Sequence, residues 1–357
     1  MSIPSTALIV AGGRGTRLLP VTEHLPKPML PFCGAPFLAG LARRLGEAGV
    51  RRVGLVVGAD TSPFDPLVDL LAPHGIEVSL VPEPEPLDTA GGVRAATVGL
   101  DEPVLVLNGD VLSDLDVAAL CTAHASTGAV ATIALTRVED TSTFGVCVLE
   151  GDRITAFVEK PARGTLPGHD TVNAGAYVLA AGALAGFPEG PLSFEREVFP
   201  QMLAAGGRIT GYVHEGVWTD LGTPDRFLDG QRLVLEGAMP WPPLADLDDL
   251  GELEGRTSRS GVLVGRDVRV ASDARLDAPV VLGDRVSIGS GAAVGPGVVM
   301  AQDVHVGDGA DVTMSLLCDG VIVGQGAALD GAIVAPRGRI DPRQVVSGPV
   351  GGPAPDA

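Results

Sequence analysis

The sequence lacks several features that would place it in a membrane, secreted or metal-scaffold class. It has no run of about 18 apolar residues, which argues against a helix that spans a membrane. Its N-terminus has neither the basic start nor the long apolar segment of a secretory signal. The four cysteines are far apart and match neither metal-ligand spacing nor a disulfide framework. We therefore expect a cytoplasmic protein with no membrane partner.

Positive charge is also scarce. The 25 basic residues face 44 acidic ones, and the net charge is −19. A nucleic-acid partner is not expected, because such proteins present a basic face. Only two of the basic residues, Lys27 and Lys160, are lysines. Lysine is a compact point charge whereas arginine is a planar fork, so these two positions are candidates for sites that require an ammonium group.

Short apolar runs alternate with helical patterns over the first 230 residues. The runs cover residues 7–11, 53–57, 78–81, 104–107 and 130–135, and helical patterns cover 37–48 and 65–71. This alternation predicts an α/β fold with a Rossmann-like, doubly wound mixed sheet. Ligands of such sheets bind at the carboxyl ends of the strands, so the loops that follow the runs are the candidate site.

The C-terminal third has a different period. An aliphatic residue recurs every six positions at Val264, Val270, Leu276, Leu282, Ile288, Val294, Met300, Val306 and Val312. A six-residue period is typical of the hexapeptide repeats of a left-handed parallel β-helix. The series loses register after Val312 and resumes near Val323 and Leu329, which predicts about four coils.

These patterns predict four segments: a catalytic domain over 1–230, a linker over 231–258, a hexapeptide-repeat β-helix over 259–345 and a disordered tail over 346–357. Unpaired end coils would be aggregation-prone edges, so we expect a homo-oligomer formed through the β-helix. A hexapeptide acyltransferase is a weaker alternative, because His305 is the only histidine in the repeats and the domain is short.

The first apolar run ends in Gly12-Gly13-Arg14-Gly15-Thr16-Arg17. Glycines after a strand let the backbone approach a phosphate closely. The spacing matches neither the dinucleotide fingerprint nor a Walker A loop, which disfavours a nicotinamide enzyme. Ten residues after Arg17, the sequence Pro26-Lys27-Pro28 holds a lysine between two stiffening prolines.

The stretch from Ala11 to Leu30 resembles the signature of the sugar-nucleotide pyrophosphorylases, most closely the mannose-1-phosphate guanylyltransferase branch. The resemblance implies transfer of a nucleotidyl group from an NTP, with GTP favoured, to a sugar 1-phosphate, with release of pyrophosphate. It implies that Arg17, Lys27 and Asp110 are catalytic. The residues that it implies for the triphosphate are Ala11, Gly12, Gly13, Gly15, Thr16 and Arg17.

Two further motifs carry carboxylates. Asp110 follows the run 104–107, and Asp220 lies in Trp218-Thr219-Asp220-Leu221-Gly222, which looks like the family's second metal motif. The resemblance implies that the two aspartates hold Mg²⁺. This fits the ion's preference for one or two carboxylates plus substrate oxygens.

Three short motifs of this chain resemble the motifs with which the family binds the sugar phosphate. They contain Gly145, Glu159-Lys160-Pro161 and Asn173-Ala174-Gly175. The resemblance implies that Gly145, Glu159 and Asn173 contact sugar hydroxyls and that Lys160 contacts the sugar phosphate. No covalent nucleophile is needed, because the sugar phosphate itself attacks the nucleotide.

The loop over residues 85–92 lies where the family reads the base, which implies nucleotide contacts for Asp88, Thr89, Ala90 and Gly91. Many guanylyltransferases have glycine where this chain has Asp88. An acidic group there could accept hydrogen bonds from guanine. Three alternatives stay open. The enzyme could use another base, or another acceptor such as glucose 1-phosphate, a heptose phosphate or a cyclitol phosphate. The chain could also be a non-catalytic regulatory subunit that binds sugar nucleotides.

Overall fold

The computed structural model describes residues 3–166, 168–243, 247–249 and 261–353. The chain forms two compact units. Unit 1 comprises Met1–Gly13 and Leu41–Trp218, and unit 2 comprises Arg14–Gly40 and Thr219–Ala357. Within the described ranges, no helix is long and apolar enough to cross a membrane.

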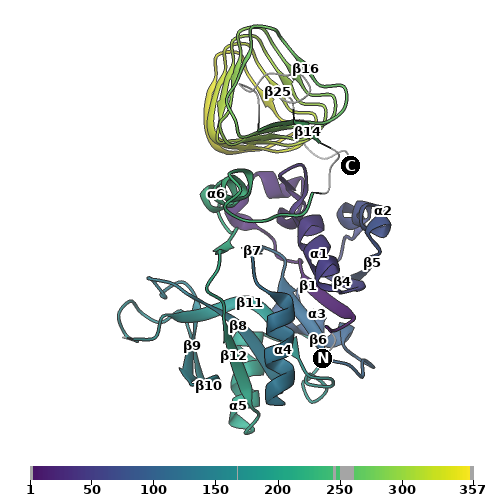
Figure 1. Ribbon diagram of the computed structural model, residues 1–357, viewed down its shortest axis with the longest axis vertical. Helices are drawn as coiled ribbons and strands as arrows, with labels where there is room; N and C mark the ends of the chain where they lie inside the picture. Colours follow the sequence, from purple (N-terminus) through teal and green to yellow (C-terminus); the bar gives the residue numbers. More distant parts are fainter. Residues whose placement is uncertain (1–2, 167, 244–246, 250–260, 354–357) are drawn as a thin grey trace. The chain divides into compact units, whose positions relative to one another are not determined.

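Unit 1 is built on a nine-stranded mixed sheet with the order β5-β4-β1-β6-β11-β8-β12-β10-β9 (Figure 1). Its strands are β1 (Thr6–Val10), β4 (Arg52–Gly58), β5 (Glu77–Glu83), β6 (Val104–Asn108), β8 (Ala131–Arg137), β9 (Gly145–Glu150), β10 (Arg153–Glu159), β11 (Thr171–Leu179) and β12 (Ile209–Val213). Strands β5, β4, β1 and β6 are parallel, and β11 is antiparallel to both β6 and β8. The predicted Rossmann-like mixed sheet is therefore confirmed.

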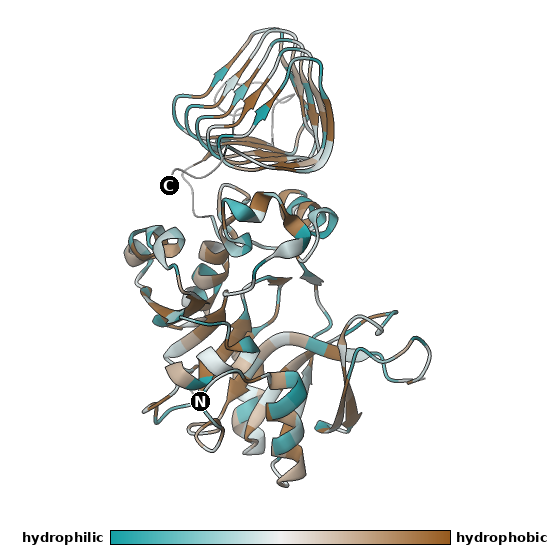
Figure 2. Cartoon of the chain, turned by 180° about the vertical axis from the view of Figure 1, so that it is seen from behind, coloured by the Kyte–Doolittle hydropathy of each residue, from teal (hydrophilic) through white to brown (hydrophobic). Residues whose placement is uncertain are grey.

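Hydrophobic residues along these strands form the core of unit 1, as the colouring of Figure 2 shows. Leu8, Val106 and Tyr177 are almost completely buried there. The main helices of the chain are α1 (Phe37–Ala48), α2 (Pro66–Leu71), α3 (Asp88–Ala96), α4 (Val117–Thr127), α5 (Phe199–Ala204) and α6 (Pro224–Leu235). Helix α1 has the bounds that its apolar pattern predicted. Helix α6 continues five residues into the predicted linker.

Short elements complete the folded core of the chain. They are η1 (Thr16–Leu18), η2 (Val21–Glu23), η3 (Lys27–Met29), β2 (Pro31–Phe32), β3 (Ala35–Pro36), η4 (Ser62–Phe64), η5 (Ala72–His74), β7 (Val111–Ser113), the π-helical turn η6 (Phe194–Val198), β13 (Trp218–Asp220) and β14 (Asp248–Asp249). In unit 2, Trp241 packs on Phe32 and stacks on Phe37 with ring centroids 5.3 Å apart. A Cβ at Gly40 would lie 2.2 Å from the Trp241 ring, so this packing requires a glycine.

Residues 261–350 form the C-terminal coil, in which short strands pair in parallel with strands one turn further along the chain (Figure 1). The first ladder is β15 (Val262–Val264), β18 (Val280–Leu282), β21 (Val298–Met300), β24 (Leu316–Leu317) and β26 (Ala328–Val334). The second is β16 (Arg269–Val270), β19 (Ser287–Ile288), β22 (His305–Val306), β25 (Ile322–Val323) and β27 (Arg339–Ile340). The third is β17 (Arg275–Leu276), β20 (Ala293–Val294), β23 (Asp311–Thr313), β26 and β28 (Val345–Val350). This arrangement is consistent with a parallel β-helix.

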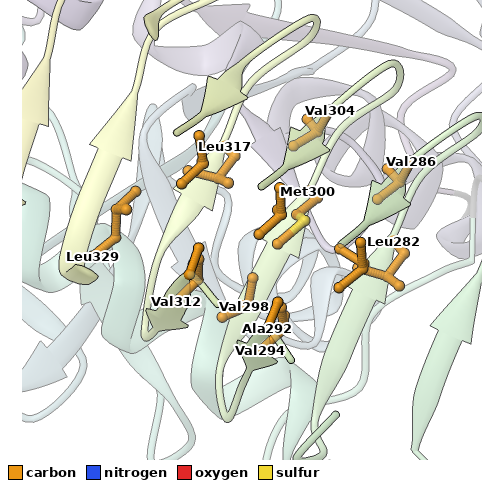
Figure 3. Packing of buried hydrophobic residues seen from close by; sticks show 14 of the residues in the cluster. Leu282, Val286, Ala292, Val294, Val298, Met300, Val304, Val312, Leu317 and Leu329 are labelled. Carbon is orange, nitrogen blue, oxygen red and sulfur yellow. The ribbon is translucent and has the colours of Figure 1, made fainter. Parts of the chain in front are cut away.

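The repeated aliphatic residues fill the interior of the coil (Figure 3). All nine belong to its core: Val270 packs half-buried at the edge, and the other eight are buried. Facing side chains are 18 residues apart in the early turns, as for Ser287 and His305, but 17 apart later, as for Thr313 and Asp330. This shorter turn explains the loss of register after Val312. The ladders have five strands, whereas the sequence predicted about four coils. Residues 346–350, assigned to the tail, belong to β28.

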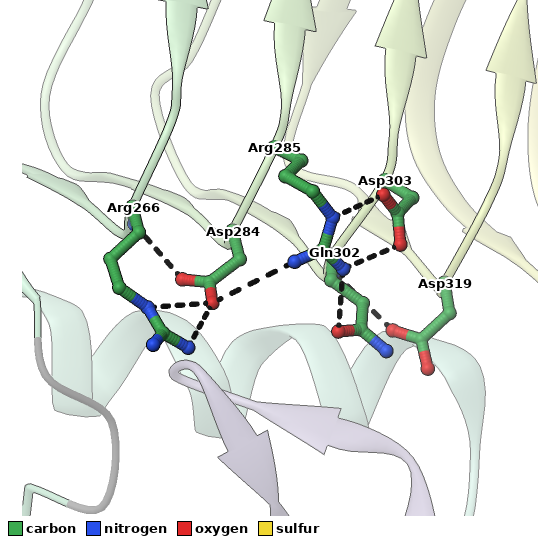
Figure 4. Close-up of polar contacts among 6 residues, drawn as sticks. All are labelled: Arg266, Asp284, Arg285, Gln302, Asp303 and Asp319. Carbon is green, nitrogen blue, oxygen red and sulfur yellow. Dashed lines mark hydrogen bonds and ion pairs between the residues drawn. The ribbon is translucent and has the colours of Figure 1, made fainter.

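A ladder of polar side chains follows one corner of the coil (Figure 4). Arg266 pairs with Asp284 at 2.6 Å, and Arg285 pairs with Asp303 at 2.7 Å. Each pair joins residues 18 positions apart, so it connects neighbouring turns. The corner ladder thus connects successive turns of the coil.

Candidate active site

The glycine loop begins where β1 ends, beside the end of β6. The Ala11 N–H donates to the Val56 carbonyl at 2.7 Å, and the Gly109 N–H donates to the Val10 carbonyl at 2.8 Å. A Cβ at Gly109 would lie 2.8 Å from that same carbonyl oxygen, so the two backbones approach too closely for another residue. The ends of these parallel strands therefore bring the segment that starts at Ala11 close to the turn that carries Asp110.

In unit 2, the continuation of the loop folds around Lys27. Gly15 has a left-handed φ of 59° and begins η1, and its carbonyl accepts a hydrogen bond from the Thr22 hydroxyl at 3.1 Å. A Cβ at Gly15 would lie 3.1 Å from the Lys27 Cβ, which shows how closely the lysine stem packs on the loop. Lys27 is buried, with 7% exposure. A buried ammonium needs partners that compensate its charge.

Asp220, also in unit 2, lies among cationic groups. Its Oδ2 is 3.2 Å from Nη1 of Arg226 and 3.9 Å from Nη2 of Arg17. A Cβ at Gly222 would lie 2.3 Å from the same Arg17 nitrogen, so the guanidinium group lies against this glycine. The motif from Trp218 to Gly222 thus places a predicted metal ligand beside a predicted phosphate-binding arginine.

The carboxylate of Asp88 already has partners. One oxygen accepts the Thr89 N–H at 2.8 Å, and the other forms an ion pair with Arg196. The residue has a left-handed φ of 60°, a conformation that glycine adopts without strain. These contacts hold the Asp88 carboxylate at the start of α3.

Glu83 is a second acidic residue near the glycine loop, and the sequence analysis did not single it out. It is the last residue of β5 and has 8% exposure. A Cβ at Gly12 would lie 3.1 Å from its Oε2, and a Cβ at Gly92 only 2.2 Å from its Oε1. Burial raises the pKa of Glu83, and the N–H groups of Leu87 and Gly92 oppose that rise. Within the described residues, Oε1 has no hydrogen-bond partner of normal geometry.

The turn after β10 presents Lys160. Glu159 faces Gly145 across the β9–β10 pair, and a Cβ at Gly145 would lie 2.9 Å from Oε2 of Glu159. Lys160 has a left-handed φ of 44°, its N–H donates to the Phe144 carbonyl at 3.0 Å, and its Nζ lies 3.2 Å from Oε1 of Glu159. A long side chain in this strained conformation is a feature that often marks functional sites.

Asn173 lies at an irregularity where the pairing of β11 with β8 shifts register. Its Oδ1 accepts the Gly175 N–H at 2.9 Å, and its Nδ2 donates to the hydroxyl of Tyr177 at 2.8 Å. Gly175 has a φ of 74°, and a Cβ there would lie 2.7 Å from the amide nitrogen of Asn108. The Asn-Ala-Gly motif therefore encodes a strand bulge with a fixed asparagine side chain.

The predicted site residues divide between the two units. Unit 1 holds Ala11, Gly12, Gly13, Asp88, Thr89, Ala90, Gly91, Asp110, Gly145, Glu159, Lys160 and Asn173, and unit 2 holds Gly15, Thr16, Arg17, Lys27 and Asp220. Within unit 1 the structure brings Glu159 next to Gly145 and Lys160, and within unit 2 it brings Arg17 next to Asp220. Sequence reasoning singled out neither Glu83, which lies near Gly12, nor Glu195, whose carboxylate accepts hydrogen bonds from Thr89 and Asn173.

Comparison with known proteins gives the family. The model of the family described as "Nucleotidyl transferase" matches residues 6–237. This chain belongs to that family. It is 38% identical over 287 residues to "Mannose-1-phosphate guanylyltransferase" of Mycobacterium tuberculosis, which covers 77% of this chain and 79% of the relative. It is 38% identical over 243 residues to "Mannose-1-phosphate guanylyltransferase catalytic subunit beta" of Danio rerio, with 66% of each chain covered.

Solved structures agree with this assignment. HddC from Yersinia pseudotuberculosis is 27% identical, covers 65% of this chain and 100% of its own, and superposes with a TM-score of 0.55. A second structure of HddC, in complex with GMP-PN, gives the same values. The nucleotidyltransferase is therefore an enzyme of the family that the sequence resemblance indicated.

Proposed function

We propose that the enzyme transfers GMP from GTP to mannose 1-phosphate. A phosphate oxygen of mannose 1-phosphate attacks the α-phosphorus of GTP, the bond to the β-phosphate oxygen breaks, and GDP-mannose and pyrophosphate form. The relatives named as mannose-1-phosphate guanylyltransferases support the choice of substrates. The observation that carries the proposal is the placement of the two lysines: Lys27 is buried against Gly15, and Lys160 occupies a left-handed turn beside Glu159.

Each proposed role follows from charge and location. Lys27 and Arg17 neutralise the triphosphate and the departing pyrophosphate, and Lys160 holds the sugar phosphate, because positioning and charge stabilisation dominate phosphoryl-group transfer. Gly145, Glu159 and Asn173 bind sugar hydroxyls. The nucleotide is bound by two segments. One supplies backbone N–H groups along Ala11, Gly12, Gly13, Gly15 and Thr16, and the other is the loop of Asp88, Thr89, Ala90 and Gly91.

We propose that Mg²⁺ is held by Asp110 and Asp220. Both are carboxylates next to glycine-containing turns, and Arg17 beside Asp220 would hold the same anionic substrate. Mg²⁺ commonly takes one or two carboxylates and completes its shell with water and phosphate, which matches this pair. When bound, the ion would neutralise charge that develops on the phosphates.

Glu83 supports GTP as the nucleotide. Guanine presents two adjacent donors, N1–H and the exocyclic amine, which a carboxylate can accept together. Glu83 is buried beside the glycine loop, and a donor on the ligand would add a hydrogen bond to its carboxylate. Replacement of Glu83 by Gln should therefore lower kcat/KM for GTP more than for the other NTPs. Replacement of the exposed Glu85 by Gln is the control, and it should leave kcat/KM unchanged for GTP and for the other NTPs.

The direct test of the catalytic assignment is Asp110→Asn. Loss of a metal-stabilised charge costs several kcal/mol, so pyrophosphate release should fall at least about a hundredfold. Asp116→Asn is the matched control, because Asp116 caps α4 by accepting the Ala119 N–H at 2.8 Å and asparagine caps equally well. If Asp110→Asn kept more than about a tenth of the activity while its fold was intact, the metal role of Asp110 would be wrong.

We also propose that the C-terminal coil is a left-handed hexapeptide-repeat β-helix through which the enzyme forms a homo-oligomer in the cytoplasm. The outermost strands of its ladders support this, because they present backbone groups that a second chain can pair with. Sedimentation equilibrium of the full chain tests it. A monomer at micromolar concentration would contradict the proposal.

A further inference from the structure

Glu195, in the π-helical turn η6, uses its two carboxylate oxygens in different directions. Oε2 accepts a hydrogen bond from the Thr89 hydroxyl at 3.0 Å and one from the Ser193 hydroxyl at 3.1 Å. Thr89 belongs to the loop assigned to the nucleotide, and it is 106 positions away in the sequence. One oxygen of Glu195 is therefore fixed by the nucleotide side of the site.

The other oxygen faces the sugar side. Oε1 accepts from the Tyr177 hydroxyl at 3.3 Å and from the Asn173 amide nitrogen at 3.4 Å. The same amide nitrogen donates to the Tyr177 hydroxyl at 2.8 Å. Asn173 is assigned to the sugar hydroxyls, so a single carboxylate bridges the two halves of the proposed site.

The nucleotide end of the bridge is firmly anchored. The Thr89 hydroxyl accepts the Phe194 N–H at 3.0 Å while it donates to Glu195. Around it, the Ala90 N–H donates to the Leu192 carbonyl at 2.8 Å, and the Leu192 N–H donates to the Leu87 carbonyl at 3.0 Å. A shift of this loop on nucleotide binding would therefore move Glu195 with it.

The sugar end determines how Asn173 presents its amide. Both N–H groups of Nδ2 point to Tyr177 and Glu195, while Oδ1 accepts the Gly175 N–H. Tyr177 is completely buried, and burial together with the charge of Glu195 raises its pKa well above the ordinary value, so its hydroxyl stays protonated. Without Glu195, the Asn173 amide loses one of the two acceptors of Nδ2, and only Tyr177 and the Gly175 N–H still hold its orientation.

We propose that Glu195 is a positioning residue that couples the nucleotide and sugar-phosphate sites: nucleotide bound at the Thr89 loop fixes the carboxylate, and the carboxylate fixes the Asn173 amide for the sugar. The inference rests on the proposed function and adds a coupling that the residue assignments alone do not imply. Such coupling is reciprocal, so each substrate strengthens binding of the other by the same factor.

The test is a grid of initial rates of pyrophosphate release with GTP and mannose 1-phosphate varied together. In the wild type, saturating GTP should lower the apparent KM for mannose 1-phosphate by about fivefold or more. Glu195→Ala should remove this dependence. Glu195→Gln should keep most of it, because the amide can still accept from Tyr177 and Asn173 and can donate to the Thr89 and Ser193 hydroxyls.

Glu197→Ala is the matched control on the same turn. Glu197 accepts only the Ser193 N–H among the contacts described, at 2.9 Å, and it touches neither Thr89 nor Asn173. It should retain the wild-type dependence even if its melting temperature falls. Thr89→Val is a second variant that breaks the opposite end of the bridge, and it should lose the dependence while the Asn173 environment is kept.

The outcomes separate the two proposals. The coupling is overturned, and the proposed function stands, if the wild type is active and Glu195→Ala retains the dependence of the mannose 1-phosphate KM on GTP. The same conclusion follows if Glu197→Ala loses this dependence as fully as Glu195→Ala does. A wild type that releases no pyrophosphate overturns the proposed function and the coupling with it. Both proposals are supported if Glu195→Ala and Thr89→Val lose the dependence of the mannose 1-phosphate KM on GTP while Glu195→Gln retains it.

Discussion

Unit 1 and the C-terminal coil both contain non-glycine residues with left-handed backbone, but in different arrangements. In unit 1 these are Asp88 (φ 60°), at the start of α3, and Lys160 (φ 44°), in the turn after β10. In the coil, Asp267, Arg285 and Asp303 have φ values of 57–59° at the same corner of successive turns. A left-handed residue that recurs with the repeat belongs to the repeat, whereas an isolated one such as Lys160 is a candidate for a functional site.

The polar contacts differ in the same way. In the coil, many side-chain pairs join residues 17 or 18 positions apart, so each turn depends mainly on its neighbours (Figure 4). In unit 1, Glu195 joins segments 106 positions apart. A substitution in the coil should therefore change stability alone, while one in the unit 1 network should change catalysis. The following predictions test this contrast, from the largest expected effect to the smallest.

Met300→Ala should destabilise the coil most. The side chain has no exposed surface and lies in the interior (Figure 3), and truncation of a buried methionine costs about 2–5 kcal/mol. Denaturant unfolding of the full chain measures the loss. Val345→Ala is the control, because this side chain is 82% exposed and should change stability by less than about 0.5 kcal/mol. Equal effects of the two variants would refute the interior packing.

Lys160→Gly should separate the effect of backbone strain on stability from the effect of the ammonium group on substrate binding. Glycine relieves the left-handed backbone, so the free energy of unfolding should not fall. Loss of the ammonium group should raise the KM for mannose 1-phosphate at least about tenfold, because a charge-assisted contact to phosphate disappears. Steady-state kinetics measure this. An unchanged KM would remove Lys160 from the sugar-phosphate site.

Arg343→Gly is the corresponding change in the coil. Arg343 has a φ of 62° and is exposed, so glycine should leave stability unchanged or raise it by about 1 kcal/mol. Turnover should stay at the wild-type value. Lower activity at equal stability would mean that corners of the coil also serve catalysis, and the contrast between the regions would fail.

Arg266→Ala should have the smallest effect, because an exposed ion pair contributes less than about 1 kcal/mol. The Arg266 backbone and side chain hold the pKa of Asp284 below its ordinary value. A carboxyl with a lowered folded pKa stabilises above its unfolded pKa, and this contribution is lost as pH falls through the folded value. The difference between variant and wild type should therefore shrink as pH falls below about 4. A difference independent of pH would contradict the pairing.

Periodic signals predicted the fold well. The bounds of α1 and the strand positions follow from local apolar patterns, and the six-residue series identified the interior of the coil from Val264 to Val312. The number of coils was underestimated, because a turn shortened by one residue shifts every later residue out of the series. The period alone does not reveal such a change.

The candidate site was predicted where a motif carries its own spacing, as for Gly12, Lys27 and Asp110. Those roles stay predictions. Glu83 and Glu195 were missed because their environment arises from tertiary contacts: Glu83 becomes buried only when β5 packs beside Gly12 and Gly92, and Glu195 meets Thr89 only in the folded chain. The nucleotide contact of Asp88 also stays a prediction, and its ion pair with Arg196 arises only in the folded chain.

The most direct test of the central claim is magnesium-dependent pyrophosphate release across four NTPs and a panel of sugar phosphates. The panel should contain the 1-phosphates of mannose, glucose, N-acetylglucosamine and a heptose, together with a cyclitol phosphate. We predict the highest kcat/KM for GTP with mannose 1-phosphate, and loss of that signal in Asp110→Asn. No release with any pair, or a clear maximum at another nucleotide or acceptor, would contradict the proposed reaction.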